Sequence, residues 1–64
     1  MENTKTDYNE FDLQWKLLEL IEEDEDFDGT VNTYSDSGVL TRDAGLVVRD
    51  DEGNEFQVTI VRSR

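Results

Sequence analysis

The sequence predicts an α+β fold in which one N-terminal amphipathic helix packs on a three-stranded antiparallel sheet, in the order α-β-β-β. Apolar residues follow a helical spacing up to residue 27 and an alternating, strand-like spacing after Gly29. Two clusters of turn-forming residues, at 35–38 and 50–53, divide the second part. At 64 residues the chain is expected to be one small domain, 1–64, with residues 1–6 frayed.

The helix is expected over residues 7–28. Asp7 is followed three residues later by Glu10, which fits the capping-box pattern with Asp7 as the cap. Gly29 is the expected cap residue at the other end. The apolar face that should pack in the core consists of Phe11, Trp15, Leu18 and Ile21, widened by Leu13, Leu17 and Leu20.

The strands are expected at 30–34, 44–49 and 54–62, with 39–41 as a further short extended piece. Residues 50–53 predict a type I turn with Gly53 in the left-handed bulge position. Arg49 is expected to pair with Asp50 or Asp51, its neighbours along the chain. The two sheet faces are set by alternation: Phe56, Val58 and Ile60 should match Leu46 and Val48 across the hairpin, while Val47, Thr59 and Val61 should face solvent or a second subunit.

The net charge of −11 is uneven along the chain. Residues 1–28 carry 11 carboxylates against two lysines, and residues 29–64 carry six against four arginines. Such a field repels nucleic acid and anionic lipid and attracts basic surfaces. The chain has no His or Cys, which excludes His-based catalysis and His/Cys zinc sites, and no nucleophile motif is present, so a non-enzymatic protein is expected. No apolar run is long enough for a membrane span and residues 1–4 do not look like a signal peptide, so a cytoplasmic location is expected.

Residues 22–28 are the most informative segment, because six of the seven are acidic and they fall where the helix should end. A helix C-terminus favours cations, and each anion there costs roughly 0.3–1 kcal/mol. A sequence that breaks a local rule in this way often does so for function. The candidate partner-binding residues, which would contact a basic protein surface, are Asp12, Glu19, Glu22, Glu23, Asp24, Glu25, Asp26 and Asp28, with the loop acids Asp36, Asp43, Asp50 and Asp51 as an extension.

Two alternatives remain open at the level of sequence. Residues 24–35 resemble a twelve-residue EF-hand loop over its first nine positions, which would make calcium the cofactor. The ligands would be Asp24, Asp26, Asp28, the Thr30 carbonyl and Asn32. The twelfth position, usually a bidentate Glu, is Ser35, and no second helix is predicted after it. The other alternative is a merely solvated acidic surface, as in a protein from a high-salt organism.

The profile as a whole resembles the small acidic phage-encoded inhibitors that mimic DNA, including many anti-CRISPR proteins. The resemblance lies in size, charge, the Cys-free single domain and an acidic helix carrying Asp12, Glu19, Glu22, Glu23 and Glu25. It implies a stoichiometric inhibitor, monomer or homodimer, located in the host cytoplasm. The implied partner is a basic nucleic-acid-binding complex such as a CRISPR effector.

Overall fold

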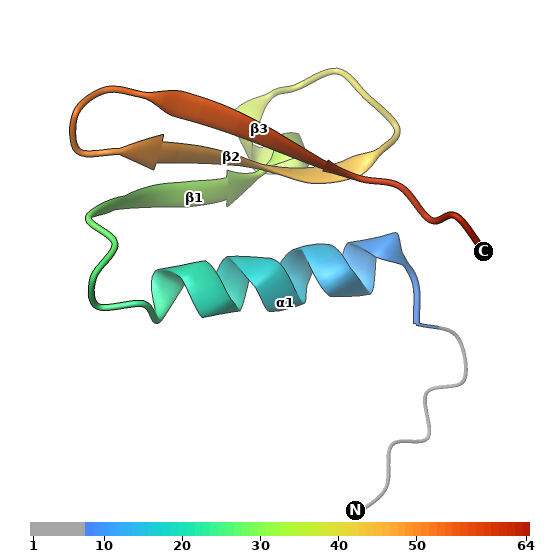
Figure 1. Ribbon diagram of the computed structural model, residues 1–64. Coiled ribbons are helices and arrows are strands. Elements are labelled where there is room, and N and C mark those ends of the chain that lie inside the picture. Colours follow the sequence, from blue (N-terminus) through green and yellow to red (C-terminus); the bar gives the residue numbers. More distant parts are fainter. Residues whose placement is uncertain (1–7) are drawn as a thin grey trace, which may run out of the picture.

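A computed structural model describes residues 8–64 (Figure 1). The elements, in chain order, are α1 (Glu10–Glu22), β1 (Gly29–Thr33), α2 (Tyr34–Ser37), β2 (Ala44–Asp50) and β3 (Glu55–Ile60). The strands form an antiparallel sheet in the order β1-β2-β3, with α1 packed against it. The predicted α-β-β-β arrangement is therefore confirmed, apart from the short α2, which the sequence did not predict. The segment 1–6 that was expected to fray lies outside the described residues, as does Asp7.

α1 is shorter than the predicted 7–28 helix at both ends. Its N-cap is Asn9, whose side-chain Oδ1 accepts the N–H groups of Phe11 and Asp12, both at 3.0 Å. The Asp12 carboxylate in turn accepts the Asn9 N–H at 2.8 Å, completing a capping box two residues later than the predicted Asp7 and Glu10. At the other end the C-cap is Glu23, so the expectation that Gly29 caps the helix was wrong.

Local hydrogen bonding explains why α1 stops before the last acidic residues. The Asp24 carboxylate accepts the N–H of Asp26 at 3.0 Å, and the Asp24 carbonyl accepts the N–H of Phe27 at 3.2 Å. Short Asp side chains offer the backbone such alternatives to helical bonding, which favours a turn. Gly29 instead begins β1, where a Cβ atom would lie 2.7 Å from the Phe27 ring.

The β2–β3 hairpin has the predicted register, with Gly53 in the predicted left-handed conformation. Leu46 pairs with Val58, Val48 with Phe56, and Ala44 with Ile60. Gly53 has a φ of +91°, as its bulge position requires, and its N–H donates to the Asp50 carbonyl at 3.4 Å. The last strand ends at Ile60, two residues earlier than expected, and residues 39–41 form no strand.

The core lies between α1 and the first two strands. Leu18, Val31 and Leu46 form its buried centre, with Leu17, Ile21 and Val48 packed against them. The prediction that Phe11 and Trp15 belong to this core was wrong, because they are 44% and 53% exposed. The helix instead turns Gln14, only 5% exposed, toward the sheet.

The face of the sheet turned away from α1 is also partly covered. The ring of Tyr34, the first residue of α2, lies over Gly45, where a Cβ atom would overlap it. The Tyr34 hydroxyl shares a 2.7 Å hydrogen bond with the Thr59 hydroxyl. Val47 is 2% exposed, so the expectation that it faces solvent or a second subunit was wrong. Tyr34 itself is buried, at 4% exposed.

Candidate functional site

The predicted partner-binding acids divide into two groups in the structure. Glu19 and Glu22 are exposed on the last turns of α1, and the exposed C-cap Glu23 follows directly. The α1–β1 connection carries the remaining exposed members of the group: Asp24, Glu25, Asp26 and Asp28. Asp12 does not belong with them, because it lies in the first turn of α1 and caps the helix. At 1.5 Å per residue, the helix separates Asp12 from Glu22 by about 15 Å along its axis.

The fold brings a second acidic segment to the same end of the molecule. Gly29, directly after the α1–β1 connection, is the register partner of Asp50, the last residue of β2. The β2–β3 turn therefore lies at the same end of the fold as the acidic connection (Figure 1, left side). We call the nine carboxylates gathered there the acidic end: Glu22, Glu23, Asp24, Glu25, Asp26, Asp28, Asp50, Asp51 and Glu52.

Not all of the loop acids extend this surface. Asp36 lies in α2 and Asp43 immediately before β2, so both lie at the opposite end of the sheet from the β2–β3 turn. Of the four loop acids named from the sequence, only Asp50 and Asp51 join the acidic end. Glu52, which was not singled out, joins them because it belongs to the same turn.

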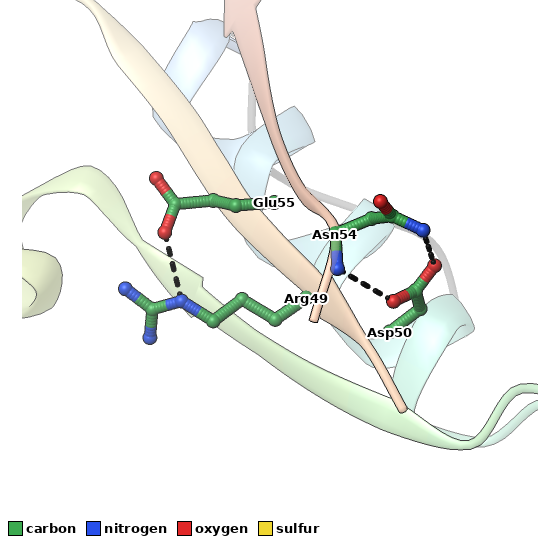
Figure 2. Close-up of polar contacts among 4 residues, drawn as sticks. All are labelled: Arg49, Asp50, Asn54 and Glu55. Carbon is green, nitrogen blue, oxygen red and sulfur yellow. Dashed lines mark hydrogen bonds and ion pairs between the residues drawn. The ribbon is translucent and has the colours of Figure 1, made fainter. Parts of the chain in front are cut away.

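The geometry of the turn holds one of these carboxylates rigidly (Figure 2). Asp50 Oδ1 accepts the N–H groups of Glu52 and Asn54, each at 2.9 Å, and Asp50 Oδ2 accepts the Asn54 side-chain amide at 2.8 Å. The Asn54 side-chain bond is the main reason that the pKa of Asp50 lies below its ordinary value of 3.8. Asp50 is therefore a fixed anion at neutral pH.

The only arginine adjoining the acidic end is already paired with a carboxylate. Arg49 Nε donates to Glu55 Oε1 at 2.8 Å, across the hairpin (Figure 2). The expectation that Arg49 pairs with Asp50 or Asp51 was wrong, because neighbours along a strand point to opposite faces whereas Arg49 and Glu55 are register partners. Segments 22–28 and 50–54 contain no lysine or arginine. The local charge of the acidic end is therefore strongly negative.

The conflict with the helix dipole is smaller than the sequence suggested. Only Glu22 and Glu23 lie at the end of α1, and the other acids of segment 22–28 are in the connection. The cost of anions at a helix terminus falls off within the last turn. The larger electrostatic feature of this end is the number of its carboxylates, nine in two segments that contain no lysine or arginine.

The proposed calcium ligands occupy two different kinds of structure. Asp24, Asp26 and Asp28 are in the α1–β1 connection, whereas Thr30 and Asn32 are in β1, paired with Arg49 and Val47. One oxygen of Asp24 is taken by the N–H of Asp26. Within residues 8–64, no three Asp, Glu, His or Cys side chains are close enough together to hold a metal ion.

Exposed aromatic side chains form a feature that the sequence pattern concealed. Phe11 and Trp15 lie one turn apart on α1 and line an open depression of about 610 Å³, closed on its other side by residues 38–43. Leu40 in that segment is 99% exposed. Helical spacing placed Phe11 and Trp15 on the apolar arc, and only the position of the sheet shows that they lie at its uncovered margin. Large exposed apolar groups of this kind are common anchors in protein interfaces.

In the part of the chain from residue 8 onward, no helix has the length and apolar character needed to cross a membrane. Comparison of the chain with models of protein families, with curated proteins and with solved structures finds no significant match. The chemistry of the chain's own surfaces is therefore the basis for inferring its function.

Proposed function

We propose that this protein is a non-enzymatic interaction protein whose acidic end occupies the basic, nucleic-acid-binding surface of a partner. The observation that carries the proposal is the meeting of two separate acidic segments, 22–28 and 50–52, at one end of the fold. An acidic surface needed only for solubility has no reason to be concentrated in this way, because dispersed charges serve solubility equally well.

The spacing of Glu19, Glu22 and Glu23, which lie on the last turns and at the end of α1, suits a surface that normally holds phosphates. Side chains three or four apart on a helix have Cβ atoms about 5–6 Å apart, and successive phosphates along one strand of duplex DNA are separated by comparable steps. Lys and Arg groups arranged for a nucleic-acid backbone would meet several carboxylates at once. Binding would then exclude the nucleic acid by direct competition.

The exposed aromatic residues can supply binding affinity, to which surface charges alone contribute little. Interfaces derive most of their affinity from a few large side chains that become desolvated, and charged rims mainly set the rate and specificity of association. Trp15 lies two turns before Glu22 on α1, and the depression that it lines with Phe11 is toward the other end of the fold, so a partner that contacts both surfaces must extend along α1. The resemblance to acidic phage inhibitors makes CRISPR effectors the first class of partner to test.

The test is displacement of fluorescently labelled target DNA from purified effectors. A panel of purified CRISPR effectors, together with restriction enzymes and nucleoid proteins, is titrated with the protein, and DNA release is followed by anisotropy. We expect release from at least one member near stoichiometric protein, weakening steeply between 50 and 300 mM NaCl because surface charges are screened over about 10 Å at 0.1 M salt.

Two controls distinguish competition by the acidic end from effects that do not involve it and from direct binding to the DNA. The Asp51→Lys/Glu52→Lys variant should release DNA more weakly than the unaltered chain, since it reverses the hairpin half of the acidic end. The protein must also show no binding to the labelled DNA itself. Failure to displace DNA from every member of the panel, or equal displacement by the hairpin variant, would contradict the proposal.

A further inference from the structure

The helix-facing side of β3 is only partly covered by the fold. α1 packs on β1 and β2, and the buried core contains residues of α1, β1 and β2 only. Phe56 and Val58 point to the same side of the sheet as Leu46 and Val48 but remain 54% and 41% exposed. The third strand therefore presents an apolar surface that α1 covers only in part.

One flank of α1 continues this surface. Leu13, Leu17 and Leu20 follow one another at helical spacing, and Leu13 and Leu20 are 39% and 55% exposed. The opposite flank lies at the β1 edge, because Glu22 lines a depression with residues 29–32 of β1. The leucine flank must then lie on the β3 side. Together with Phe56 and Val58 it forms an apolar face that Glu10, one turn before Leu13, borders at the start of α1.

The backbone of β3 is also unpaired along its outer edge. The Asp50 N–H donates to the Asn54 carbonyl at 3.0 Å, which makes this a hydrogen-bonded pair of the hairpin, with the Asn54 N–H donating to the Asp50 carboxylate. Hydrogen-bonded and non-hydrogen-bonded pairs alternate in an antiparallel ladder, which makes Phe56, Val58 and Ile60 the residues bonded to β2. The N–H and C=O groups of Gln57 and Thr59 therefore point away from β2, along the free edge.

The two edges of the sheet differ in how well they are protected from pairing with another strand. Beside β1 stands the carboxylate of Glu22, and charged side chains at an edge discourage pairing with another strand. The only carboxylate of β3 is Glu55 at its first position, which is held by Arg49. β3 is therefore the edge that is apolar on one face and free of unpaired carboxylates.

We propose that β3 is the docking edge for a second copy of this chain, paired antiparallel so that two sheets join into one of six strands. A register centred on Val58 places Phe56 opposite Ile60 of the second copy, with Gln57 and Thr59 supplying the ladder hydrogen bonds. Both α1 helices then lie on the same face, and their leucine flanks border the joined Phe56 and Val58 side chains.

Charge complementarity favours a second copy as the occupant. Antiparallel pairing places the acidic ends at opposite ends of the joined sheet, so a chain of net charge −11 keeps its densest charge apart from that of its partner. The same register sets Glu52 of one copy beside Arg64 of the other, and Asn54 beside Arg62. Each acidic end thus faces the basic C-terminal segment of the second copy.

Sedimentation equilibrium and amide hydrogen exchange of the full chain test this inference. We expect twice the chain mass of 7.4 kDa at micromolar concentration, and slow exchange at the Gln57 and Thr59 amides that becomes faster on dilution. In a monomer both amides face water and would exchange rapidly at every concentration. A mass of one chain up to millimolar concentration would overturn the proposal.

Two variants locate the contact. Gln57→Pro removes an outward N–H without touching the bonds to β2, and should yield the mass of one chain, while Gln57→Ala keeps the N–H and should leave the double mass unchanged. Val58→Lys places a charge in the apolar face and should also halve the mass, which covers the case that the proline variant fails to fold. The matched control is Leu40→Lys, at a fully exposed leucine in the connection between α2 and β2, and it should retain the double mass. A double mass that persists in folded Val58→Lys would contradict the assignment to β3.

Discussion

The side-chain oxygen of Gln14 accepts the N–H of Gly45 at 3.0 Å, and this bond joins α1 to the sheet at the point where β1 ends. The last register pair of β1 and β2 is Thr33 with Leu46, after which the chain turns into α2. The N–H of Gly45 is directed toward β1, but β1 ends before it reaches Gly45, so no strand residue accepts this hydrogen bond. Gln14 satisfies this buried donor, which explains why a polar residue occupies the centre of the helix face.

Replacing Gln14 by Leu should destabilise the fold even though it makes the core more apolar. The substitution leaves the Gly45 N–H buried without an acceptor, which typically costs about 1–3 kcal/mol. Urea unfolding followed by Trp15 fluorescence measures the change. Gln57→Leu is the matched control, because Gln57 is exposed, and its free energy of unfolding should change by less than about 0.5 kcal/mol. Equal effects at the two glutamines would show that the Gln14–Gly45 bond has no special role.

The contact between Tyr34 and Gly45 makes a second prediction for stability. Gly45→Ala puts a methyl group where the Tyr34 ring lies, and the resulting strain should lower the free energy of unfolding by about 1–3 kcal/mol. In the double variant Gly45→Ala/Tyr34→Ala the ring is absent, so the glycine substitution should then cost little. A double-mutant cycle measures this coupling, and purely additive effects would contradict the overlap.

The hairpin predicts a specific pH dependence. The Asn54 amide lowers the pKa of Asp50, so the ionised carboxylate stabilises the fold above its ordinary pKa of 3.8, and this contribution is lost as the pH falls through the lower, folded-state pKa. Asn54→Ala should raise the Asp50 pKa toward 3.8, measured by NMR titration of the carboxyl carbon. Its deficit in stability relative to the unaltered chain should shrink as the solution is acidified from pH 6 to pH 3. Asn32→Ala, an exposed asparagine on β1, should leave the Asp50 titration unchanged.

Crowding at the acidic end predicts that salt stabilises the protein. Screening of the carboxylates in segments 22–28 and 50–52 should raise the melting temperature by several degrees between 10 and 200 mM NaCl, since about 1 kcal/mol shifts a domain of this size by roughly 4–8 °C. Calcium at matched ionic strength should raise it by the same amount. A larger rise with calcium, accompanied by specific binding heat in calorimetry, would favour the EF-hand-like alternative at residues 24–35.

The parts of the fold that are encoded locally could be predicted from the sequence. Alternating Leu46, Val48, Phe56 and Val58 around an Asp-Asp-Glu-Gly turn specify both the hairpin and its register. The start of α1 was misplaced because two overlapping pairs, Asp7 with Glu10 and Asn9 with Asp12, satisfy the same capping pattern. Propensity alone does not choose between them.

The packing of segments that are distant in the sequence could not be predicted, and this packing decides which side chains are buried and which are exposed. The broad apolar arc of α1 does not reveal which part the sheet covers, so Phe11 and Trp15 were placed in the core and Gln14 was overlooked. Val47 was assigned to an exposed face because the sequence did not show that Tyr34 lies on that face. Tyr34 is placed there by α2, a helix too short to give a periodic pattern. The union of the two acidic segments likewise depends on the pairing of Gly29 with Asp50.

The most direct measurement compares two variants of equal net charge in the DNA-displacement assay. Glu23→Lys alters the acidic end, and Glu10→Lys alters the other end of α1, outside the residues that line the depression beside Phe11 and Trp15; each reversal adds two charges, so both variants change the net charge from −11 to −9. We predict that the first variant loses displacement by at least tenfold, while the second retains it within about twofold. Equal loss in both variants would mean that total charge alone drives binding, and full activity of the first would contradict a role for the acidic end.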